Sequence, residues 1–390
     1  MTLRYAPLEK TILPKLNWSD FIENHTYENT ETHIEKLLTK SISNIEKSNS
    51  KITVSLSSGI DSTLVLAILR KTFPAIDIES VSVKFADSID ETEASKKISE
   101  KFETNHHILF VENFLEELPK AISIVKLPFW DLHWYHIAKK VKSLSNLFLS
   151  GDGGDELFGG YTFRYKKFLN SGITQTSSKT DKINSYLNSH ERDWVPDQEN
   201  LFGKIMNFSW GDIHKILEPY FDNSLPLLSQ VFLADFNGKL LYNMVPLYNK
   251  LHEFFNIKNI SPFLSTDIIS YATKIPNSKK FNIETELGKP LLIQLLKKYN
   301  VDNLVLQKKQ GFSVNTMNLW KKFGQKLCEY YLDNGRIVTN GFVNQAWINK
   351  YLKNSEIDVR IVNKFLGLLA FEIWYRLFIT HELNENDKLS

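Results

Sequence analysis

Two kinds of periodicity alternate along the first half of the chain. Apolar residues between positions 30 and 45 recur at three-and-four spacing, which predicts an amphipathic helix (Ile34, Leu37, Leu38, Ile42 and Ile45). Thr30 or Thr32 is placed to cap the start of this helix. The pattern then changes to a short apolar run at residues 52–56, which predicts a buried strand, and residues 63–71 are again helical in pattern.

The same alternation continues for about another hundred residues. Residues 78–85, 106–111 and 146–150 have the character of strands, and residues 90–102 and 113–125 between them have helical patterns. Strands that alternate with helices at this spacing predict an α/β fold, with a parallel, twisted sheet and helices on both faces. In such sheets, ligands bind at the carboxyl ends of the strands.

Helical patterns dominate beyond about Phe158, and we expect no further strands there. We predict an N-terminal arm at residues 1–28 and one domain at residues 29–390. The sheet core of that domain is expected at about 50–170. The helical part, at about 183–390, is expected to pack as a large C-terminal layer over the ligand edge of the sheet.

The composition excludes several classes of protein. Apolar residues make up 42% of the 390 residues and charged residues 24%, which is typical of a globular and not of a disordered chain. The 47 basic and 45 acidic residues give a formal charge of +2, so we expect no nucleic-acid partner. A single cysteine, Cys328, cannot form an internal disulfide or a cysteine-based zinc site.

We expect a cytoplasmic protein that does not contact the membrane. The N-terminal residues lack the apolar segment of a signal peptide. The most apolar stretch, from Phe365 to Thr380, is interrupted by Glu372 and Arg376 and is shorter than the ~20 apolar residues that a membrane span needs. It is expected to be a buried amphipathic helix.

The first candidate site is the segment Leu56-Ser57-Ser58-Gly59-Ile60-Asp61-Ser62, between a predicted strand and a predicted helix. Hydroxyls and backbone N–H groups at the start of a helix can hold a pyrophosphate, because the helix dipole is positive there. The segment is not a GxxxxGK[ST] loop, since no lysine follows the glycine. The alternative is an ordinary turn in which Asp61 or Ser62 caps the helix.

The second candidate site is the segment from Ser150 to Tyr161, which again follows a predicted strand. It contains three carboxylates and five glycines (Asp152, Asp155, Glu156, Gly151, Gly153, Gly154, Gly159 and Gly160). Carboxylates packed so closely repel one another without a cation, so the segment indicates a Mg²⁺ site. A purely structural tight turn is the alternative.

The two segments lie about ninety residues apart, and a third, Gln307-Lys308-Lys309-Gln310-Gly311-Phe312, follows later. In this order they resemble the synthetase domain of the asparagine synthetase and β-lactam synthetase family. The resemblance covers roughly Thr30 to Phe378. It implies the N-type ATP pyrophosphatase fold, which is also called the adenine nucleotide alpha hydrolase-like or PP-loop fold.

The resemblance also implies roles for single residues. Asp61 and Asp155 would bind Mg²⁺, Asp152 would be a catalytic carboxylate, and Lys309 would neutralise charge as an acyl-adenylate forms and collapses. Lys289 would be either a phosphate contact or a solvated charge at the start of a helix. The residues implied to bind the pyrophosphate and adenosine parts of ATP are Leu56, Ser57, Ser58, Gly59, Asp61, Ser62, Val83, Ser150 and Gly151.

The family chemistry has two steps. A substrate carboxylate attacks the α-phosphorus of ATP, which gives an acyl-adenylate and pyrophosphate, and an amine then attacks the acyl carbon to form an amide. ATP and Mg²⁺ are therefore the expected co-substrate and cofactor. Negative charge develops in both steps, and a fixed cation stabilises it most effectively.

The chain departs from the family pattern in three respects. It begins Met1-Thr2-Leu3, without the N-terminal catalytic cysteine of glutamine-dependent members, so we expect ammonia, a separate glutaminase subunit or a substrate amine to supply nitrogen. Ser58 stands where the family usually has glycine. Positions that line the family's substrate pocket are also changed, so aspartate is not the expected substrate (Asn249, Lys250, Lys258, Ile260 and Ser265).

Two other functions remain open at this point, a tRNA-modifying ATP pyrophosphatase and an inactive nucleotide-binding regulator. The sequence also leaves open whether the protein is a homodimer. Two histidine pairs are weaker candidates. His106 and His107 would point to opposite faces of a strand, and His133 and His136 would need zinc-binding partners that the sequence does not identify.

Overall fold

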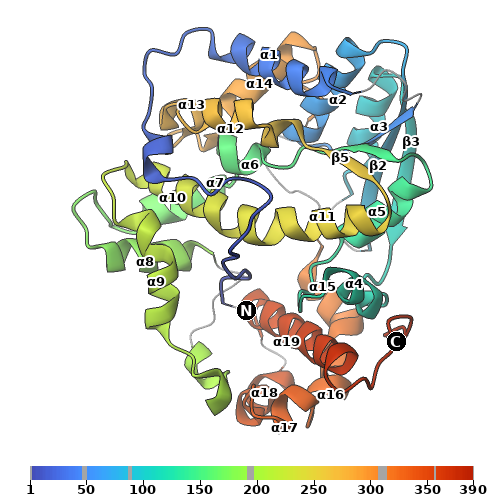
Figure 1. Ribbon diagram of the computed structural model, residues 1–390, viewed down its shortest axis with the longest axis vertical. Coiled ribbons are helices and arrows are strands. Elements are labelled where there is room, and N and C mark those ends of the chain that lie inside the picture. The colour runs from blue at the N-terminus through green and yellow to red at the C-terminus, as the bar shows by residue number, and fades with distance from the viewer. Residues whose placement is uncertain are drawn as a thin grey trace.

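A computed structural model describes residues 2–45, 51–86, 90–190, 197–305, 314–354 and 357–389. Over these residues, one sheet has five parallel strands in the order β3-β2-β1-β4-β5 (Figure 1). The strands are β1 (Lys51–Ser55), β2 (Asp77–Phe85), β3 (Asn105–Val111), β4 (Leu147–Leu149) and β5 (Lys258–Ile260). The predicted parallel α/β sheet is confirmed.

The order of the strands reverses next to β1. The chain first adds β2 and β3 on one side of β1 and then returns to add β4 and β5 on the other. Ligands of open parallel sheets bind where the order reverses, at the carboxyl ends of the two strands concerned. Those strands are β1 and β4, and they lead directly into the two candidate segments.

The prediction that strands end near Phe158 is wrong. The fifth strand, β5, pairs with β4 through Leu147 and Lys258, Phe148 and Asn259, and Leu149 and Ile260. A three-residue edge strand is too short to display a periodic pattern, and its partner strand determines it. Residues 281–282 and 287–288 also pair as a small antiparallel hairpin (β6, Phe281–Asn282, and β7, Leu287–Gly288).

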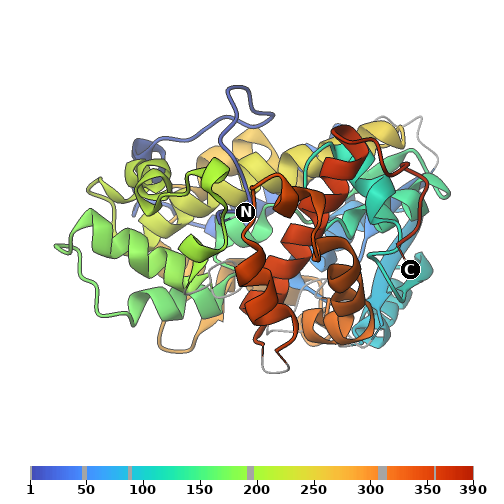
Figure 2. The same ribbon diagram turned by 90° about the horizontal axis from the view of Figure 1, so that it is seen from below.

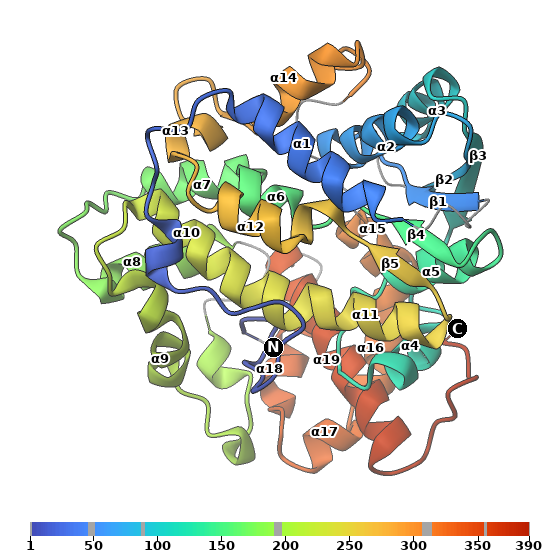
Figure 3. The same cartoon turned by 45° about the horizontal axis from the view of Figure 1, so that its top comes forward.

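Helices cover both faces of the sheet, as predicted. One face is covered by α1 (Thr30–Ser43), α2 (Ile60–Thr72), α3 (Thr92–Lys101) and α14 (Pro290–Lys298) (Figure 3). The other is covered by α4 (Leu118–Val125), α5 (Trp134–Lys142), α11 (Val245–Phe254) and α19 (Val359–Phe378). Ile52, Thr53 and Val54 of β1 are fully buried, as expected for a central strand enclosed on both faces.

The helical half contains two groups. The first comprises α6 (Gly154–Phe158), α7 (Thr162–Leu169), α8 (Lys179–Ser189), α9 (Trp210–Phe221), α10 (Leu227–Asp235) and the π-helix η4 (Phe236–Met244), with α12 (Thr266–Ala272) and α13 (Asn277–Lys280). The second comprises α15 (Thr316–Leu319), the π-helix η6 (Trp320–Gly324), α16 (Gln325–Leu332), α17 (Arg336–Thr339), α18 (Gln345–Leu352) and α19. This orange-to-red group lies below the sheet in Figure 1 and faces the viewer in Figure 2.

The N-terminal residues before α1 contain one 3₁₀ turn, η1 (Trp18–Phe21), and lie across the helical half. Helix α1 begins at Thr30, and its N-cap is Asn29 in the left-handed region, so the prediction of a threonine cap is wrong. Two more 3₁₀ turns, η2 (Gln198–Asn200) and η3 (Lys204–Met206), lie between α8 and α9, and a third, η5 (Pro262–Leu264), lies between β5 and α12. Among the described helices, none is long and apolar enough to cross a membrane.

Candidate active site

The loop between β1 and α2 is fixed by its own hydroxyl groups. The backbone N–H of Ser57 donates to Ser62 Oγ at 3.1 Å, and the Ser57 and Ser62 hydroxyls lie 3.0 Å apart. Ser57 Oγ also accepts a hydrogen bond from the N–H of Gly59 at 3.1 Å. The loop therefore holds the N-terminus of the thirteen-residue helix α2 open toward the ligand edge of the sheet.

The second loop, between β4 and α6, packs directly on the first. A Cβ atom on Gly151 would lie 2.9 Å from the Cβ of Asp61, and one on Gly154 would lie 2.5 Å from Asp61 Oδ1. Gly153 has a φ of +90°, in the left-handed region that favours glycine. The glycines of the second loop are therefore required for Asp61 to approach its backbone so closely.

Lys289 joins the two loops. Its ammonium nitrogen lies 2.5 Å from Asp61 Oδ2 and 2.6 Å from Asp155 Oδ1. The lysine is the N-cap of α14 with a φ of +57°, and its N–H donates to the carbonyl of Lys280 at 2.9 Å. Because its side chain is only 7% exposed, the alternative of a solvated helix-start charge is wrong. The role of Lys289 as a phosphate contact stays a prediction.

Asp61 and Asp155 together fit a divalent cation. Asp61 Oδ1 is buried and has no hydrogen-bond partner among the described residues, as expected of a carboxylate oxygen that awaits a ligand. Over the same residues, no cluster of three or more His, Cys, Asp or Glu side chains could hold a metal. Two carboxylates are enough for Mg²⁺, which commonly takes its other ligands from water and substrate phosphates.

Asp152 lies in the second loop, two residues after Ser150. Its Oδ2 accepts a hydrogen bond from the Ser150 hydroxyl at 2.7 Å, and that hydroxyl lies 2.9 Å from the hydroxyl of Ser261. The pKa of Asp152 is raised to about 6, mainly by burial; the hydrogen bond from Ser150 opposes this shift and the negative charge of Asp61 adds to it. A carboxylate with this pKa can accept a proton near neutral pH.

Residues 33–376 match the family model for asparagine synthase. The chain belongs to the asparagine synthase family. This agrees with the resemblance carried by the sequence segments. The site just described, at the junction of β1 and β4, lies within the matched residues.

Relatives with curated names are asparagine synthetases. A provisionally named glutamine-hydrolysing asparagine synthetase of Methanocaldococcus jannaschii is 34% identical over 131 residues, which are 32% of this chain and 25% of that protein. Glutamine-hydrolysing asparagine synthetase 1 of Bacillus subtilis is 22% identical over 356 residues, which are 83% of this chain and 56% of the relative. The chain thus spans between a quarter and just over half of the length of these relatives.

Among solved structures, NMN synthetase from Francisella tularensis aligns with a TM-score of 0.28 and 11% identity. The alignment covers 59% of this chain and 98% of the synthetase. A similarity this low carries no argument about function.

The other residues expected to bind ATP lie at the same sheet edge. Leu56 follows β1 and is fully buried, and its N–H donates to the carbonyl of Val81 at 2.9 Å. Val83 lies near the carboxyl end of β2. The side chain of Glu91 faces Ser58, and burial raises the pKa of this carboxyl although Ser58 hydrogen-bonds to it. Lys309 lies outside the described residues, so its place in this family member stays a prediction.

The five changed positions that correspond to the family's substrate pocket do not lie together around one site in this structure. Lys258 begins β5 opposite Leu147, at the amino end of the strands and away from the ligand edge. Lys250 donates to the carbonyl of Val125 at the end of α4, and Asn249 donates to Glu253. Ile260 alone is bonded to the second loop, because its carbonyl accepts from the N–H of Ser150 at 3.1 Å. Ser265 precedes α12.

Sequence reasoning missed a partly buried acidic residue, Asp131. Asp131 pairs with Arg4 of the N-terminal arm, and the Arg4 charge together with Lys239 holds the pKa of Asp131 below its ordinary value despite burial. Tyr248 of α11 lies within electrostatic range of both Asp131 and Asp152. The charges of both Asp152 and Asp131, after burial, raise the pKa of Tyr248. Arg4 and Asp131 are single charged residues without a local pattern, so only the fold brings them together.

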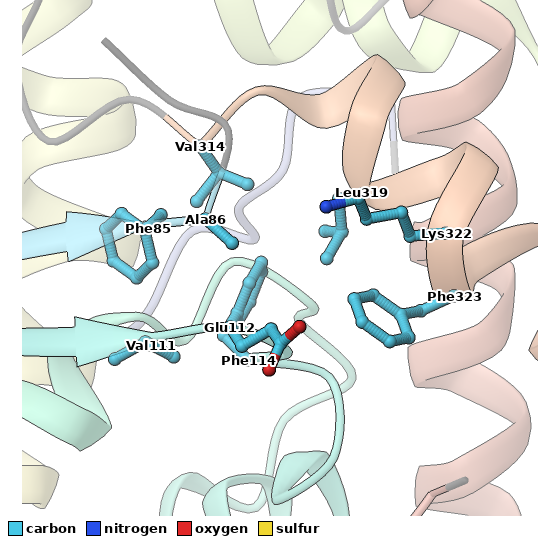
Figure 4. A pocket seen from close by; sticks show the side chains of 9 residues that line it. All are labelled: Phe85, Ala86, Val111, Glu112, Phe114, Val314, Leu319, Lys322 and Phe323. Carbon is cyan, nitrogen blue, oxygen red and sulfur yellow. The ribbon is translucent and has the colours of Figure 1, made fainter. Parts of the chain in front are cut away.

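A small pocket opens at the carboxyl ends of β2 and β3, against α15 and η6 (Figure 4). Its walls are mostly apolar, and the Glu112 and Lys322 side chains reach it from the sheet side and the helix side (Figure 4). The apolar lining residues are Phe85, Ala86, Val111, Phe114, Val314, Leu319 and Phe323. The Phe85 ring also lies 6.1 Å from the ring of His133.

The histidines do not form a metal site in the described part of the chain. His106 bonds to Ser80 at 2.8 Å and His107 to Glu79 at 2.6 Å, so the two rings have different partners. Burial lowers the pKa of His133 to about 4, and this ring is therefore neutral at physiological pH. Cys328 is buried in α16, where burial raises the pKa of its thiol.

Proposed function

We propose that the protein is an ATP- and Mg²⁺-dependent ligase that forms an amide through an acyl-adenylate, with release of AMP and pyrophosphate. The observation that carries this proposal is the meeting of Asp61, Asp155 and Lys289 beside the serine-lined start of α2. Membership of the asparagine synthase family supports the carbon–nitrogen ligase class. Family membership does not identify the nucleotide products, so the release of AMP and pyrophosphate is proposed here.

Each residue has a proposed task. Ser57, Ser62 and the N–H groups at the start of α2 would hold the pyrophosphate part of ATP. Asp61 and Asp155 would hold Mg²⁺, which supplies positive charge that stabilises the pentavalent phosphorus and the leaving pyrophosphate. Lys289 now neutralises both carboxylates, and with the cation bound its ammonium is free to contact a phosphate oxygen. Lys309 would offset the charge that develops at the acyl carbon.

Asp152 is the proposed base for the second step. An attacking amine must lose a proton as it bonds to the acyl carbon, and a carboxylate with a pKa of about 6 is mostly ionised at neutral pH yet can still accept a proton. The neighbouring hydroxyl pair of Ser150 and Ser261 orients the carboxylate. The amine would then attack from the side on which Tyr248 and Asp131 lie.

The proposed acyl substrate is a carboxylic acid other than aspartate. The proposal rests on the changes at the family's substrate positions, where Asn249, Lys250 and Ser265 stand in this chain. The pocket of Figure 4 lies at the same edge of the sheet as the proposed nucleotide site but has room for little more than a water molecule, so it does not define the acyl group. Ammonia, a separate glutaminase subunit or a substrate amine is the proposed nitrogen source.

The proposal is tested by incubating the purified chain with ATP, Mg²⁺ and a panel of carboxylic acids, and by measuring pyrophosphate and AMP. At least one acid should stimulate equimolar release of AMP and pyrophosphate. ADP as the sole nucleotide product would contradict the proposal. Asp61→Asn and Asp155→Asn should lower the rate by on the order of 10²-fold or more, because removing a ligand of the cation removes transition-state stabilisation. The matched control is Asp212→Asn, a surface aspartate on α9 with 63% side-chain exposure.

A second pair of variants tests Lys309. Lys309→Met should still bind ATP but form little amide, since the lost charge acts in the transition state and less on nucleotide affinity. Lys309→Arg should restore activity poorly, because a planar guanidinium does not replace a compact ammonium. Full activity of Lys309→Met would exclude this role.

A further inference from the structure

Strand β5 and the residue that follows it place two polar side chains beside the second loop. Strand β5 pairs in parallel with β4, and the N–H of Ser150 donates to the carbonyl of Ile260 at 3.1 Å. This register brings Ser261 next to Ser150, and Asn259 projects from the same face as Ser261 because it lies two residues earlier. A register shifted by one residue would place the apolar Ile260 next to Ser150 instead.

Three hydrogen bonds link these side chains to Asp152. Asn259 Nδ2 lies 3.2 Å from Ser261 Oγ, and that hydroxyl lies 2.9 Å from the hydroxyl of Ser150. Ser150 Oγ in turn donates to Asp152 Oδ2 at 2.7 Å. An ionised carboxylate only accepts hydrogen bonds, and an amide nitrogen only donates them. The two ends therefore fix the direction of the middle bond, in which Ser261 donates to Ser150, and every hydrogen of the chain points toward Asp152.

The chain of donors is enclosed where it reaches the carboxyl. Ser150 is 1% exposed, and Asn259 and Ser261 are half-buried. Hydrogen bonds in series polarise one another in such surroundings, so each bond is stronger than the same bond alone. The Oδ1 atom of Asn259 is buried and has no hydrogen-bond partner among the described residues. An amide that served only the stability of the fold would be expected to satisfy both of its polar atoms.

The other groups around Asp152 do not favour its ionised form. The charged and titratable groups that face this carboxyl from the described residues are Asp61 of α2, whose negative charge opposes ionisation, and Tyr248 of α11, which is itself neutral. The charged residue of β5, Lys258, lies at the amino end of the strand, and the η5 turn has no titratable side chain. Among these contacts the hydrogen bond from Ser150 stabilises the ionised carboxylate.

We propose that Asn259 and Ser261 are positioning residues that act on Asp152 through Ser150, as a chain of hydrogen-bond donors that holds the carboxylate ionised and fixed in orientation. The inference rests on the proposed role of Asp152 as the base of the second step. Because the chain occupies Oδ2, it leaves Oδ1 to accept the proton of the amine. The chain begins at an amide nitrogen, which does not release a proton, so it orients the base and does not carry the proton away.

The first test measures the ionisation of Asp152 without substrate or nucleotide. The gain in stability from Asp152→Asn, followed by urea unfolding between about pH 4 and pH 8, reports how strongly the folded protein resists ionisation of this carboxyl. In a Ser261→Ala background the gain at high pH should be larger and should correspond to a folded-state pKa higher by roughly 0.5, because the ionised form has lost the support of the chain. An unchanged gain would overturn the proposal.

The matched control is Ser145→Ala. Ser145 precedes the amino end of the same strand, β4, and its hydroxyl lies 2.7 Å from that of Thr53. This variant also breaks a partly buried pair of hydroxyls, so it should lower the free energy of unfolding at every pH and leave the gain from Asp152→Asn as it is in the wild type. If both serine variants changed that gain equally, the effect would belong to the fold and the proposal would be wrong.

The second test checks the direction of the chain. Asn259→Asp replaces the donor by an acceptor, so the Ser261 hydroxyl turns toward the new carboxylate and Ser150 loses its donor. Asn259→Leu removes the donor but leaves Ser261 directed at Ser150. The pKa of Asp152 should therefore rise by roughly 1 in Asn259→Asp and by less than half as much in Asn259→Leu. A larger rise in Asn259→Leu would contradict the direction.

Repulsion between the carboxylates of Asn259→Asp and Asp152 is separated from the chain by a double variant. In the Ser261→Ala background, Asn259→Asp should raise the pKa of Asp152 less than it does alone, because the hydroxyl that transmits its effect is gone. Equal rises in both backgrounds would show that the two carboxylates interact directly and would exclude the chain.

The donor chain and the proposed function can fail separately. With a carboxylic acid that stimulates pyrophosphate release, the pH of half-maximal amide formation should move upward in these variants together with the pKa of Asp152, since a base must be ionised to act. A change in ionisation that the rate does not follow would support the donor chain and exclude Asp152 as the base.

Discussion

The carboxyl of Asp152 is subject to opposing influences. Enclosure by protein and the nearby Asp61 charge favour its protonated form, and the Ser150 hydroxyl favours the ionised form. The net pKa of about 6 is above the ordinary 3.8, so the folded protein binds this proton more tightly than the unfolded chain does. The free energy of unfolding must therefore fall as the pH rises from about 4 through about 6.

This linkage predicts the behaviour of Asp152→Asn. Above pH 7 the variant should be more stable than the wild type by roughly 3 kcal/mol, because the neutral amide avoids the cost of ionising an enclosed carboxyl. Below about pH 4, where the carboxyl is protonated in both states, the gain should vanish. Urea unfolding at several pH values measures the difference. A gain in stability that does not change with pH would argue against an elevated pKa.

Lys289 permits a prediction about the cation site. Lys289→Met removes the ammonium between Asp61 and Asp155 and leaves two enclosed carboxylates facing each other, so it should lower the free energy of unfolding by about 3 kcal/mol without Mg²⁺. Adding Mg²⁺ should restore more stability to this variant than to the wild type, because the cation replaces the lost charge.

The control for this experiment is Lys40→Met. Its partner is Asp267, and the two side chains are 66% and 49% exposed. Such a surface pair contributes about 0–1 kcal/mol, so neither its loss nor Mg²⁺ should change stability much. If Mg²⁺ stabilised Lys289→Met and Lys40→Met equally, the cation would not bind at Asp61 and Asp155.

At this scale the sequence predicts some residues and not others. The positions of Asp61 and Asp155 can be predicted from local patterns. Each aspartate lies in a segment that joins a strand to a helix, and such a segment lies at the ligand edge of a parallel sheet. The burial of Lys289 does not follow, because a lysine at a helix start is usually solvated and only the approach of both loops encloses it. Arg4 and Asp131 are 127 residues apart and have no local signature.

Among the elements, the N-terminal arm has the most specific attachment. Two asparagines of η4 bind its backbone: Asn237 pairs with both the N–H and the carbonyl of Leu16, and Asn243 donates to the carbonyl of Arg4. The ring of Tyr5 stacks on that of Tyr242 at 6.0 Å. Helix η4 continues directly into α11, which carries Tyr248. The N-terminal arm and Tyr248 are therefore attached to the same continuous helical segment.

A double-mutant cycle on Arg4→Gln and Asp131→Asn tests this attachment. The coupling free energy at pH 7 should be on the order of 1–2 kcal/mol, since the pair is partly enclosed. Arg4 lowers the pKa of Asp131, so the stability from the pair is present above the ordinary pKa of 3.8 and is lost as the pH falls through the lower folded pKa. Coupling that persisted unchanged at pH 2 would mean that the contact is not ionic.

Element prediction from the pattern succeeded where elements are long and failed where they are short. Strands β1 to β4 were expected near their observed bounds, since apolar runs between turns identify buried strands. Strand β5 has the sequence Lys-Asn-Ile, which carries no apolar periodicity, and its pairing with β4 is a tertiary effect. The left-handed Asn29 at the start of α1 was likewise not expected.

For the whole molecule, a testable prediction concerns the source of the amide nitrogen. Residues 33–376 match the synthase family, and the single cysteine of the 390-residue chain is buried. We therefore expect the purified chain to form amide with ammonia or a suitable amine and not with glutamine alone. Amide formation measured with each nitrogen source at equal concentration decides this. Synthesis driven by glutamine, in a preparation free of glutaminase, would contradict the expectation.

The order of the residues along the chain also determines when the cluster of Asp61, Asp155 and Lys289 can form during translation. Lys289 is 228 residues further along the chain than its partner Asp61. A ribosome that has released the first 200 residues has delivered both aspartates but no counter-ion for them. Until α14 emerges, the nascent sheet has two like charges at the junction of β1 and β4, so free Mg²⁺ in the cell would be the cation available to hold the two loops together.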